Sequence, residues 1–198
     1  RIEIASRCKQ HEPKQALAGD FRIHEKKSPG DVKIRKGSVD KAFKECHIIV
    51  EKTYFAGSQD HAYLEPEAAI AIPEERGGFT AISTNHRPFR TRNLVARILG
   101  RPESEVRIIT PYIGGGFGGK DTYGPVISSI AAVAAKITGL PCMIVYTRYE
   151  SFMYRFKRTP FEIKFRTGAT KDGKLKAIEV DYTCDCGGYA GQVIGLMK

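Results

Sequence analysis

The sequence predicts an α+β fold in which mixed β-sheets are joined by inserted helices. Short β-branched stretches recur along the chain, and two other stretches place apolar residues at helical spacing. The strand-like stretches outnumber the helical ones and come both before and after them, which argues against a helical bundle. With 198 residues, of which 41% are hydrophobic, the chain is long and apolar enough to bury a core.

The first half of the chain predicts three strands and one helix. Cys46 to Tyr54 forms the first strand, and Ala68 to Ile72 pairs with Phe79 to Ser83 as a hairpin. Asn93 to Leu99 then places apolar residues at helical spacing. The helix is expected to end there because Gly100 favours a left-handed cap.

The second half predicts four more strands and one long helix. The strands are expected at Glu105 to Tyr112, Cys142 to Thr147, Phe161 to Arg166 and Leu175 to Tyr182. The last two pair through an Asp-Gly turn at positions 172 and 173. The helix spans Gly124 to Thr138, with a proline in its first turn and a glycine just after its end.

A glycine-rich loop lies between the strand that ends near Tyr112 and the long helix. Five glycines occur among the six residues Gly114 to Gly119, so ordering this loop costs much backbone entropy. Glycine backbone can come close to a ligand, and successive N–H groups can converge on an anion. A strand, a glycine loop and a helix N-terminus in this order are typical of a phosphate or pyrophosphate site.

Two nucleotide-binding patterns match this loop only weakly. Gly114, Gly119 and Lys120 satisfy GxxxxGK, but Asp121 stands where a phosphate-loop NTPase requires Ser or Thr. The GxGxxG pattern is also present, although a run this rich in glycine satisfies it by chance. A nucleotide-binding module stays open as an alternative, as does a non-catalytic assembly subunit whose partner orders the loop.

Charge and cysteine content exclude several classes of protein. The net charge of +10 is dispersed and does not interleave with aromatic residues, so no nucleic-acid platform is expected. No apolar stretch is long enough to span a membrane. The cysteines are odd in number and lack metal-site spacing, which favours reduced thiols in a cytoplasmic protein: Cys8, Cys46, Cys142, Cys184 and Cys186.

Several segments together resemble the molybdenum hydroxylases, the family of xanthine dehydrogenase and aldehyde oxidase. GGGFGGKD in the glycine loop follows HAYLEPEAAIAIP (His61 to Pro73) and NLVARILGRPESEVRI (Asn93 to Ile108). The segments from Lys157 to Tyr182 and from Gly187 to Gly191 resemble the same family in the same order. The resemblance therefore extends from about His61 to Gly191.

The resemblance implies an oxidoreductase that hydroxylates an aldehyde or an N-heterocyclic carbon with oxygen from water. Its cofactor would be molybdopterin with molybdenum, in the simple or the cytosine dinucleotide form. Iron–sulfur (2Fe-2S) and flavin (FAD) groups would reside on other domains or subunits, and the full complex would be a homo-oligomer. The substrate would be a small molecule.

The resemblance also implies how the chain is divided. Residues 1–36 would link a preceding domain to residues 37–198, which would be the N-terminal part of the molybdopterin-binding domain, a piece of a larger unit. The catalytic glutamate base of the family would lie beyond Lys198, so no catalytic residue is expected here and the piece alone is expected to be inactive.

Cofactor-binding residues are implied in the loop and at one position before it. Gly115, Gly116, Phe117, Gly118 and Gly119 would approach the molybdenum centre and the pterin. In a structural alternative, Phe117 is a core plug that anchors the loop.

His86 stands where family members usually carry a glutamine that hydrogen-bonds a molybdenum ligand. Its imidazole can donate one such bond but cannot also present an amide carbonyl. The alternative is a solvent-exposed histidine at a helix start.

Two further positions have a functional and a structural interpretation. Asp121 falls where xanthine-oxidising members place a substrate-contacting glutamate, but a carboxylate there also suits a helix N-terminus. Lys120 would neutralise cofactor phosphate or fix the loop. His61, Glu65 and Glu67 form HxxxExE, which we interpret as packing next to the cofactor rather than as metal ligands.

Overall fold

A computed structural model of the chain describes residues 34–184, which form two compact units. Residues 34–59 and 159–184 make up the flanking unit, and residues 60–158 make up the inserted unit. The inserted unit is one continuous stretch of chain, whereas the flanking unit is assembled from the segments on either side of it. The predicted linker at residues 1–36 lies outside the described residues except at its end and stays a prediction.

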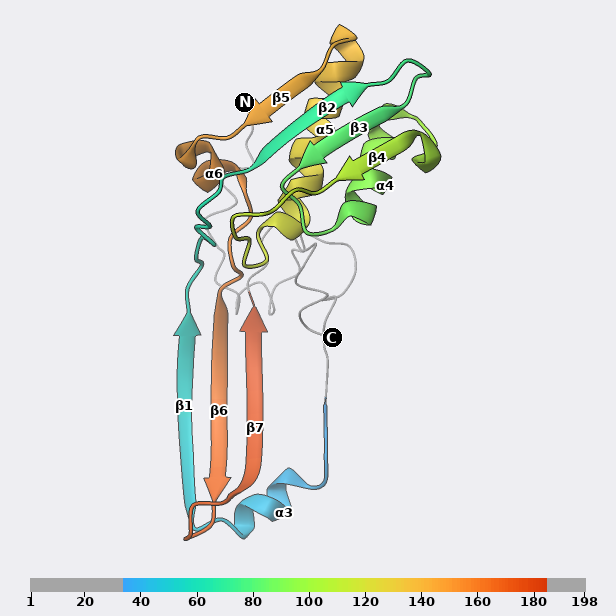
Figure 1. Cartoon of the computed structure of the whole chain (residues 1–198). Helices are drawn as coiled ribbons and strands as arrows, with labels where there is room; N and C mark the ends of the chain where they lie inside the picture. The colour runs from blue at the N-terminus through green and yellow to red at the C-terminus, as the bar shows by residue number, and fades with distance from the viewer. Residues whose placement is uncertain (1–33, 185–198) are drawn as a thin grey trace, which may run out of the picture. The chain divides into compact units, whose positions relative to one another are not determined.

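The flanking unit consists of one short helix and a three-stranded antiparallel sheet in the order β1-β6-β7 (Figure 1). Its elements are α3 (Val39–Lys44), β1 (Ile48–Ala56), β6 (Phe161–Ala169) and β7 (Leu175–Cys184). The predicted hairpin between the last two strands is confirmed. At its turn Gly173 has a φ of 81°, which glycine adopts without strain.

The helix α3 packs on this sheet at a glycine. A Cβ atom at Gly168 would lie 2.4 Å from Cys46 Sγ and 3.0 Å from Phe43 Cδ1, so only glycine permits this contact. Phe43 is buried there, yet nearly all of β1 is exposed. The sheet therefore carries little core of its own.

The inserted unit is built on a four-stranded sheet in the order β4-β3-β2-β5. Its strands are β2 (Ala68–Pro73), β3 (Phe79–Ser83), β4 (Val106–Ile109) and β5 (Cys142–Val145). The hairpin of β2 and β3 is antiparallel as predicted, while β4 pairs parallel to β3 and β5 pairs antiparallel to β2. The sheet is mixed, and the predicted α+β class is confirmed.

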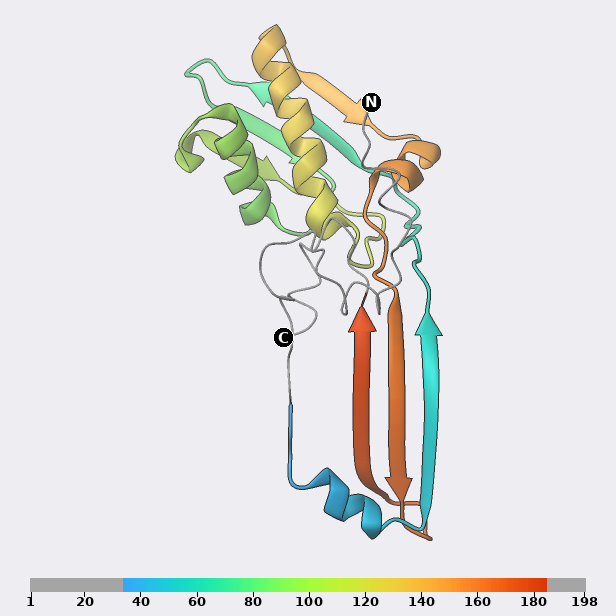
Figure 2. The same ribbon diagram turned by 180° about the vertical axis from the view of Figure 1, so that it is seen from behind.

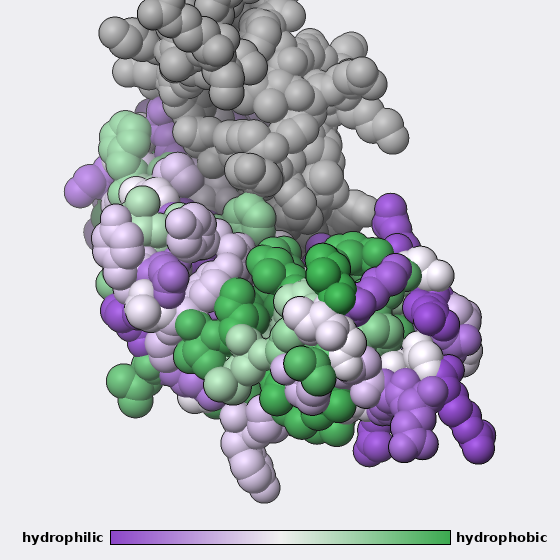
Figure 3. Space-filling model, turned by 90° about the horizontal axis from the view of Figure 1, so that it is seen from above, coloured by the Kyte–Doolittle hydropathy of each residue, from purple (hydrophilic) through white to green (hydrophobic). Residues whose placement is uncertain are grey.

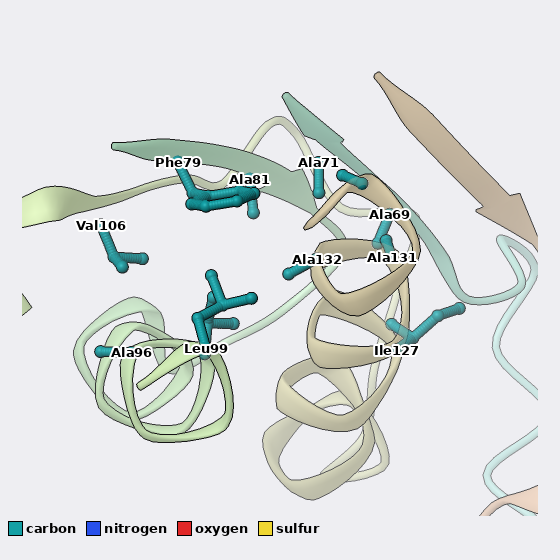
Figure 4. Packing of buried hydrophobic residues seen from close by; sticks show 12 residues of the cluster. Ala69, Ala71, Phe79, Ala81, Ala96, Leu99, Val106, Ile127, Ala131 and Ala132 are labelled. Carbon is teal, nitrogen blue, oxygen red and sulfur yellow. The ribbon is translucent and has the colours of Figure 1, made fainter. Parts of the chain in front are cut away.

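Two helices cover one face of this sheet (Figure 2). They are α4 (Pro88–Leu99), which connects β3 to β4, and α5 (Lys120–Thr138), which connects β4 to β5. The core lies between these helices and the sheet (Figure 4). It is made largely of alanines, so the helices can approach the strands closely: Ala69, Ala71, Phe79, Ala81, Val95, Ala96, Leu99, Val106, Ile127, Ala131, Ala132 and Ala135.

Both helices end on left-handed glycines, at φ 66° for Gly100 and 70° for Gly139, as the sequence predicts. The start of α5 differs from the prediction because the helix begins at Lys120 rather than at Gly124. Pro125 is therefore inside the helix. The proline is tolerated because it lies close to the N-terminal end of the helix, where its missing N–H removes only one backbone hydrogen bond.

Three short elements were not predicted from the sequence: α3, the 3₁₀ turn η1 (Glu103–Glu105) and α6 (Arg148–Tyr154). The helix α6 begins with a capping box. Thr147 Oγ1 accepts from the Glu150 N–H at 3.2 Å, and Glu150 Oε2 accepts from the Thr147 N–H at 2.8 Å.

Over residues 34–184, no helix combines the length and apolar character required to cross a bilayer.

The inserted unit exposes apolar side chains near the C-terminal end of α5. Seen from above, hydrophobic side chains gather on this surface (Figure 3). Ile137 is 80% exposed and Met143 is 72% exposed. A groove on α4 and α5 is also almost wholly apolar, and is lined by Leu94, Ile98, Val126, Ser129, Ile130 and Val133. Apolar surface of this kind is typical of an interaction site.

Candidate cofactor-binding site

The glycine loop connects β4 to α5, so the predicted order of strand, glycine loop and helix N-terminus is present. Three of its residues have positive φ: 88° at Gly115, 48° at Phe117 and 92° at Gly118. Phe117 is one of only two described non-glycine residues with positive φ. This backbone is unusual, and glycine makes most of it possible without strain.

Three consecutive N–H groups of the loop make no hydrogen bond to another described residue. Gly115 N–H donates to the Ile113 carbonyl at 2.9 Å, and Gly119 N–H donates to the Gly116 carbonyl at 2.7 Å. Between them, the N–H groups of Gly116, Phe117 and Gly118 have no hydrogen-bond partner within the described part of the chain. Successive donors of this kind next to a helix N-terminus are typical of an anion-binding nest.

The loop rests on the segment from His61 to Glu65. A Cβ atom at Gly119 would lie 2.7 Å from Tyr63 Cε1 and 3.1 Å from His61 Nδ1. A Cβ at Gly115 would lie 3.2 Å from Tyr63 Cβ, and one at Gly114 would lie 2.6 Å from Glu65 Cβ. The glycines are therefore required because the loop backbone lies directly against these side chains.

Glu65 binds both ends of the loop. Its Oε2 accepts from Gly114 N–H at 2.8 Å and from Lys120 Nζ at 2.7 Å. Its own N–H donates to the Gly114 carbonyl at 3.2 Å. Lys120 is fully buried, so this ion pair occupies the lysine that a phosphate-loop NTPase would direct at a nucleotide. The geometry therefore gives no support to the nucleotide-binding alternative.

Two opposing effects act on the pKa of Glu65. Burial on its own would raise this pKa, but the hydrogen bonds from Lys120 and Gly114, together with the lysine charge, outweigh burial and hold it below the ordinary value. The carboxylate is therefore ionised at neutral pH.

Tyr63 is a buried ring in contact with two cations. Lys120 Nζ lies 4.6 Å and Arg155 Cζ lies 4.1 Å from its ring centroid. Its hydroxyl donates to Glu67 Oε1, which is 3.7 Å from Arg155 Nη1. Arg155 also forms an ion pair with Asp60. The loop therefore lies on an aromatic ring whose two neighbouring cations are each paired with a carboxylate.

His86 lies against the loop beside the unpartnered donors. A Cβ atom at Gly116 would lie only 2.1 Å from His86 Cε1 and 2.8 Å from its Nε2. The imidazole is 36% exposed, and its Nδ1 is 3.3 Å from Asp121 Oδ1. Arg87 holds the other oxygen of that carboxylate, with Nη2 at 3.0 Å and Nε at 3.1 Å.

The structure thus brings all of the predicted site residues into one region of the inserted unit. His86 lies against both Gly116 and Asp121, and Gly115, Gly118 and Gly119 continue the same loop. The alternative in which Phe117 plugs a core is wrong because this side chain is 77% exposed.

Comparison with known proteins agrees with this geometry. Residues 23–198 match the model of the molybdopterin cofactor-binding domain. The chain belongs to this family. The predicted resemblance to the molybdenum hydroxylases is confirmed, and the four-stranded sheet with its glycine loop is part of a molybdopterin cofactor-binding domain.

Three relatives show how much of a larger protein this chain covers. It is 37% identical over 179 residues to the nicotinate dehydrogenase large molybdopterin subunit of Eubacterium barkeri, covering 90% of this chain and 40% of that subunit. It is 34% identical over 166 residues to the xanthine dehydrogenase/oxidase of Gallus gallus, and the match covers 83% of this chain and 12% of that protein. The structure of the aldehyde oxidoreductase of Desulfovibrio gigas superposes with a TM-score of 0.79 at 26% identity. The superposition covers 93% of this chain and 21% of that chain. The chain therefore spans less than half the length of these relatives.

Two residues that shape the site, Tyr63 and Arg155, were not predicted from the sequence, and neither was the contact of Glu65 with both ends of the loop. HxxxExE was correctly noted as a packing candidate, but its partner was not evident because Lys120 lies 55 positions further along the chain. Lys120 itself was assigned two open roles, and its contacts match the role of fixing the loop. The available signal was the position of each charged residue, Glu65 directly before a proline and Lys120 directly after the last glycine of the loop.

Proposed function

We propose that this chain supplies part of the cofactor site in an enzyme that oxidises an aldehyde or an N-heterocyclic carbon, with water as the oxygen source. The observation that carries the proposal is the row of three N–H groups, at Gly116, Phe117 and Gly118, that have no hydrogen-bond partner among residues 34–184. The names of the relatives, which include nicotinate and xanthine dehydrogenases and an aldehyde oxidoreductase, support this substrate class.

The residues present fit an anionic pterin cofactor that carries molybdenum. Oxygen-rich groups accept hydrogen bonds, and the loop offers backbone donors without a free lysine because Lys120 is paired with Glu65. Close approach of a large ligand requires backbone without Cβ atoms, which Gly115, Gly116, Gly118 and Gly119 provide. When bound, the molybdenum cofactor would supply the redox chemistry.

The chain's own residues would orient the cofactor. The loop N–H groups of Gly116, Phe117 and Gly118 would bind it, and the exposed Phe117 ring would limit access of water. The imidazole of His86 would donate or accept a hydrogen bond where relatives are expected to carry a glutamine amide. Asp121 was assigned to substrate binding, but its two carboxylate oxygens already face Arg87 and His86, which favours a role in holding the histidine.

The remaining parts of the activity would come from other segments or subunits. We propose that the catalytic base lies beyond Lys198 and that residues 1–198 alone are inactive. Iron–sulfur (2Fe-2S) and FAD groups on other domains or subunits would carry the electrons away, in a cytoplasmic homo-oligomer. The cofactor would be molybdopterin or its cytosine dinucleotide form. Relatives named as subunits support a multi-subunit assembly.

Metal analysis tests this proposal directly. We expect the purified full-length protein that contains this chain to hold molybdenum at about one atom per chain. A molybdenum-free protein, produced in cells that make the cofactor, would count against the proposal. Tight magnesium-dependent ATP binding would instead favour the nucleotide-binding alternative, and absence of both ligands would favour an assembly subunit.

A single substitution links the molybdenum content to the loop. Gly116→Ala places a Cβ 2.1 Å from His86 Cε1, so either the imidazole or the loop must move. We expect molybdenum per chain to fall severalfold, with a small change in melting temperature. Gly57→Ala is the matched control because a Cβ there meets no atom within 4 Å. Equal molybdenum contents in the two variants would contradict this role of the loop.

A further inference from the structure

We propose that Glu65 and Lys120 form a clamp that holds the glycine loop open for its ligand before the ligand arrives. Neither residue would touch the cofactor, so both are positioning residues. The proposal rests on the proposed function only for the identity of the ligand, because the clamp itself is formed by residues of this chain.

The contacts of Glu65 define the clamp. One carboxylate oxygen accepts from Gly114 N–H, at the first glycine of the loop, and from Lys120 Nζ, directly after the last glycine. The Glu65 N–H returns a bond to the Gly114 carbonyl. The two ends of the loop are thereby joined to a single residue of a distant segment.

The loop needs such a clamp because its own sequence favours disorder. Its glycines have many accessible conformations, and three of its N–H groups make no internal bond. Without fixed ends, the loop would have to lose this freedom when the ligand binds, which weakens binding. With fixed ends, much of the ordering is already complete and the three donors stay grouped.

Burial makes the clamp strong and specific. The Lys120 side chain is 0% exposed, so its charge depends on Glu65 for compensation. Its ammonium also lies over the Tyr63 ring, and that ring is in contact with Gly119. Loss of either charged partner would leave the other unpaired next to the loop. By contrast, removal of both charges would leave no unpaired charge.

Amide hydrogen exchange of the full-length protein without cofactor tests the clamp. The variants are Lys120→Met, Glu65→Gln and the double variant. The matched control is Arg92→Met, which breaks an ion pair with Glu103 on the surface of α4. We expect exchange at Gly114, Gly115 and Gly119, the loop residues whose N–H groups are hydrogen-bonded, to accelerate about tenfold in each single variant. The reason is that loss of a charge-assisted bond favours local opening. In the clamp variants, exchange in α4 and in β2 should match that of the unmodified protein.

The double variant provides a second readout that general destabilisation would not produce. We expect its loop exchange to increase less than the two single effects combined predict, because no charge is left unpaired. Unchanged loop exchange in the single variants would overturn the clamp. So would an increase spread evenly over the inserted unit. If Lys120→Met cannot be purified, loop exchange in Glu65→Gln alone tests the clamp. In this variant the glutamine carbonyl can still accept from Gly114 N–H, so the change that remains is the loss of the carboxylate charge that pairs with Lys120.

The outcome is separable from that of the proposed function. The exchange measurement uses protein without cofactor, whereas the proposed function depends on the molybdenum content of the unmodified protein. Faster loop exchange in the variants of a protein that never contains molybdenum would support the clamp and count against the proposed function.

Discussion

At the scale of single residues, His61 shows how the loop depends on an uncharged neighbour. Its ring lies below Gly119, and its Nδ1 is buried without a hydrogen-bond partner among the described residues. Burial, and secondarily the positive charge of Lys157, lowers the pKa of His61 below the ordinary value of 6.5. A neutral imidazole at this place avoids adding a third cation to the group around Tyr63.

This lowered pKa predicts a pH dependence of stability. As pH falls below 6.5, the unfolded chain binds a proton at His61 that the folded chain does not yet bind, so the free energy of unfolding decreases. We expect His61→Gln to show a smaller decrease between pH 7 and about pH 5.5, as measured by urea denaturation. The same substitution at the exposed His47 controls for the loss of an imidazole. Identical decreases in both variants and the unmodified protein would contradict the prediction.

The sequence predicted which residues form the loop but not how they are held. Composition alone identified Gly114 to Gly119, because a dense glycine run is visible without knowledge of the fold. The pairing of Glu65 with Lys120 depends on tertiary structure that brings distant segments together, and single-sequence patterns carry no information on such pairs. The burial of Lys120 was equally unpredictable, since lysine is rarely buried unless it is paired.

At the scale of elements, the long helix α5 is positioned by a glycine inside it. A Cβ atom at Gly124 would lie 2.5 Å from Asn85 Cβ and 2.9 Å from the Thr84 carbonyl oxygen. The helix therefore packs directly on the segment that follows β3 and leads to His86. Gly124 was predicted to begin the helix, but it lies inside the helix and permits this close packing.

Gly124→Ala is accordingly expected to destabilise the protein. Overpacking at such a contact costs about 1–3 kcal/mol, because backbone atoms of Thr84 and Asn85 cannot move aside as a flexible side chain would. Chemical denaturation of the variant measures this loss. Alanine is otherwise the better helix former, so an unchanged or increased stability would show that the helix can shift without cost.

The short helix α6 was missed, although its start was visible in the sequence. Thr147 and Glu150 have the spacing of a capping box, and both of its hydrogen bonds are formed. We expect Thr147→Ala to lower the free energy of unfolding by about 1 kcal/mol. Thr147→Ser, which keeps the hydroxyl, should restore most of the loss in the same denaturation experiment. Equal losses in the two variants would assign the effect to the threonine methyl group.

At the scale of the whole molecule, the core belongs to one unit. Every residue of the buried apolar cluster falls within residues 60–158. The flanking sheet exposes apolar side chains such as Val50, Phe55 and Leu175. The sequence did not predict the pairing of β2 with β5 or of β3 with β4. The hairpins β2–β3 and β6–β7 were predictable because each joins neighbouring segments. The pairing of β1 with β6 was not, since these strands are far apart in the sequence.

The position of the core predicts that residues 60–158 fold on their own. We expect this fragment to unfold cooperatively on heating, as followed by circular dichroism, because its core and its ion pairs, including that of Asp60 with Arg155, are complete within it. A fragment without a cooperative transition would show that its stability depends on other segments. A fragment that carries Ile127→Ala serves as a control that should melt at a lower temperature.

The pairing of Ala56 with Phe161 has a consequence for the order of folding. The chain between these two residues is the whole inserted unit, and closing so long a flexible segment costs conformational entropy. Once that unit has collapsed, the salt bridge of Arg155 with Asp60 holds its ends together and most of this cost has been met. We therefore expect the ladder of β1 and β6 to form late, after the glycine loop has taken its shape.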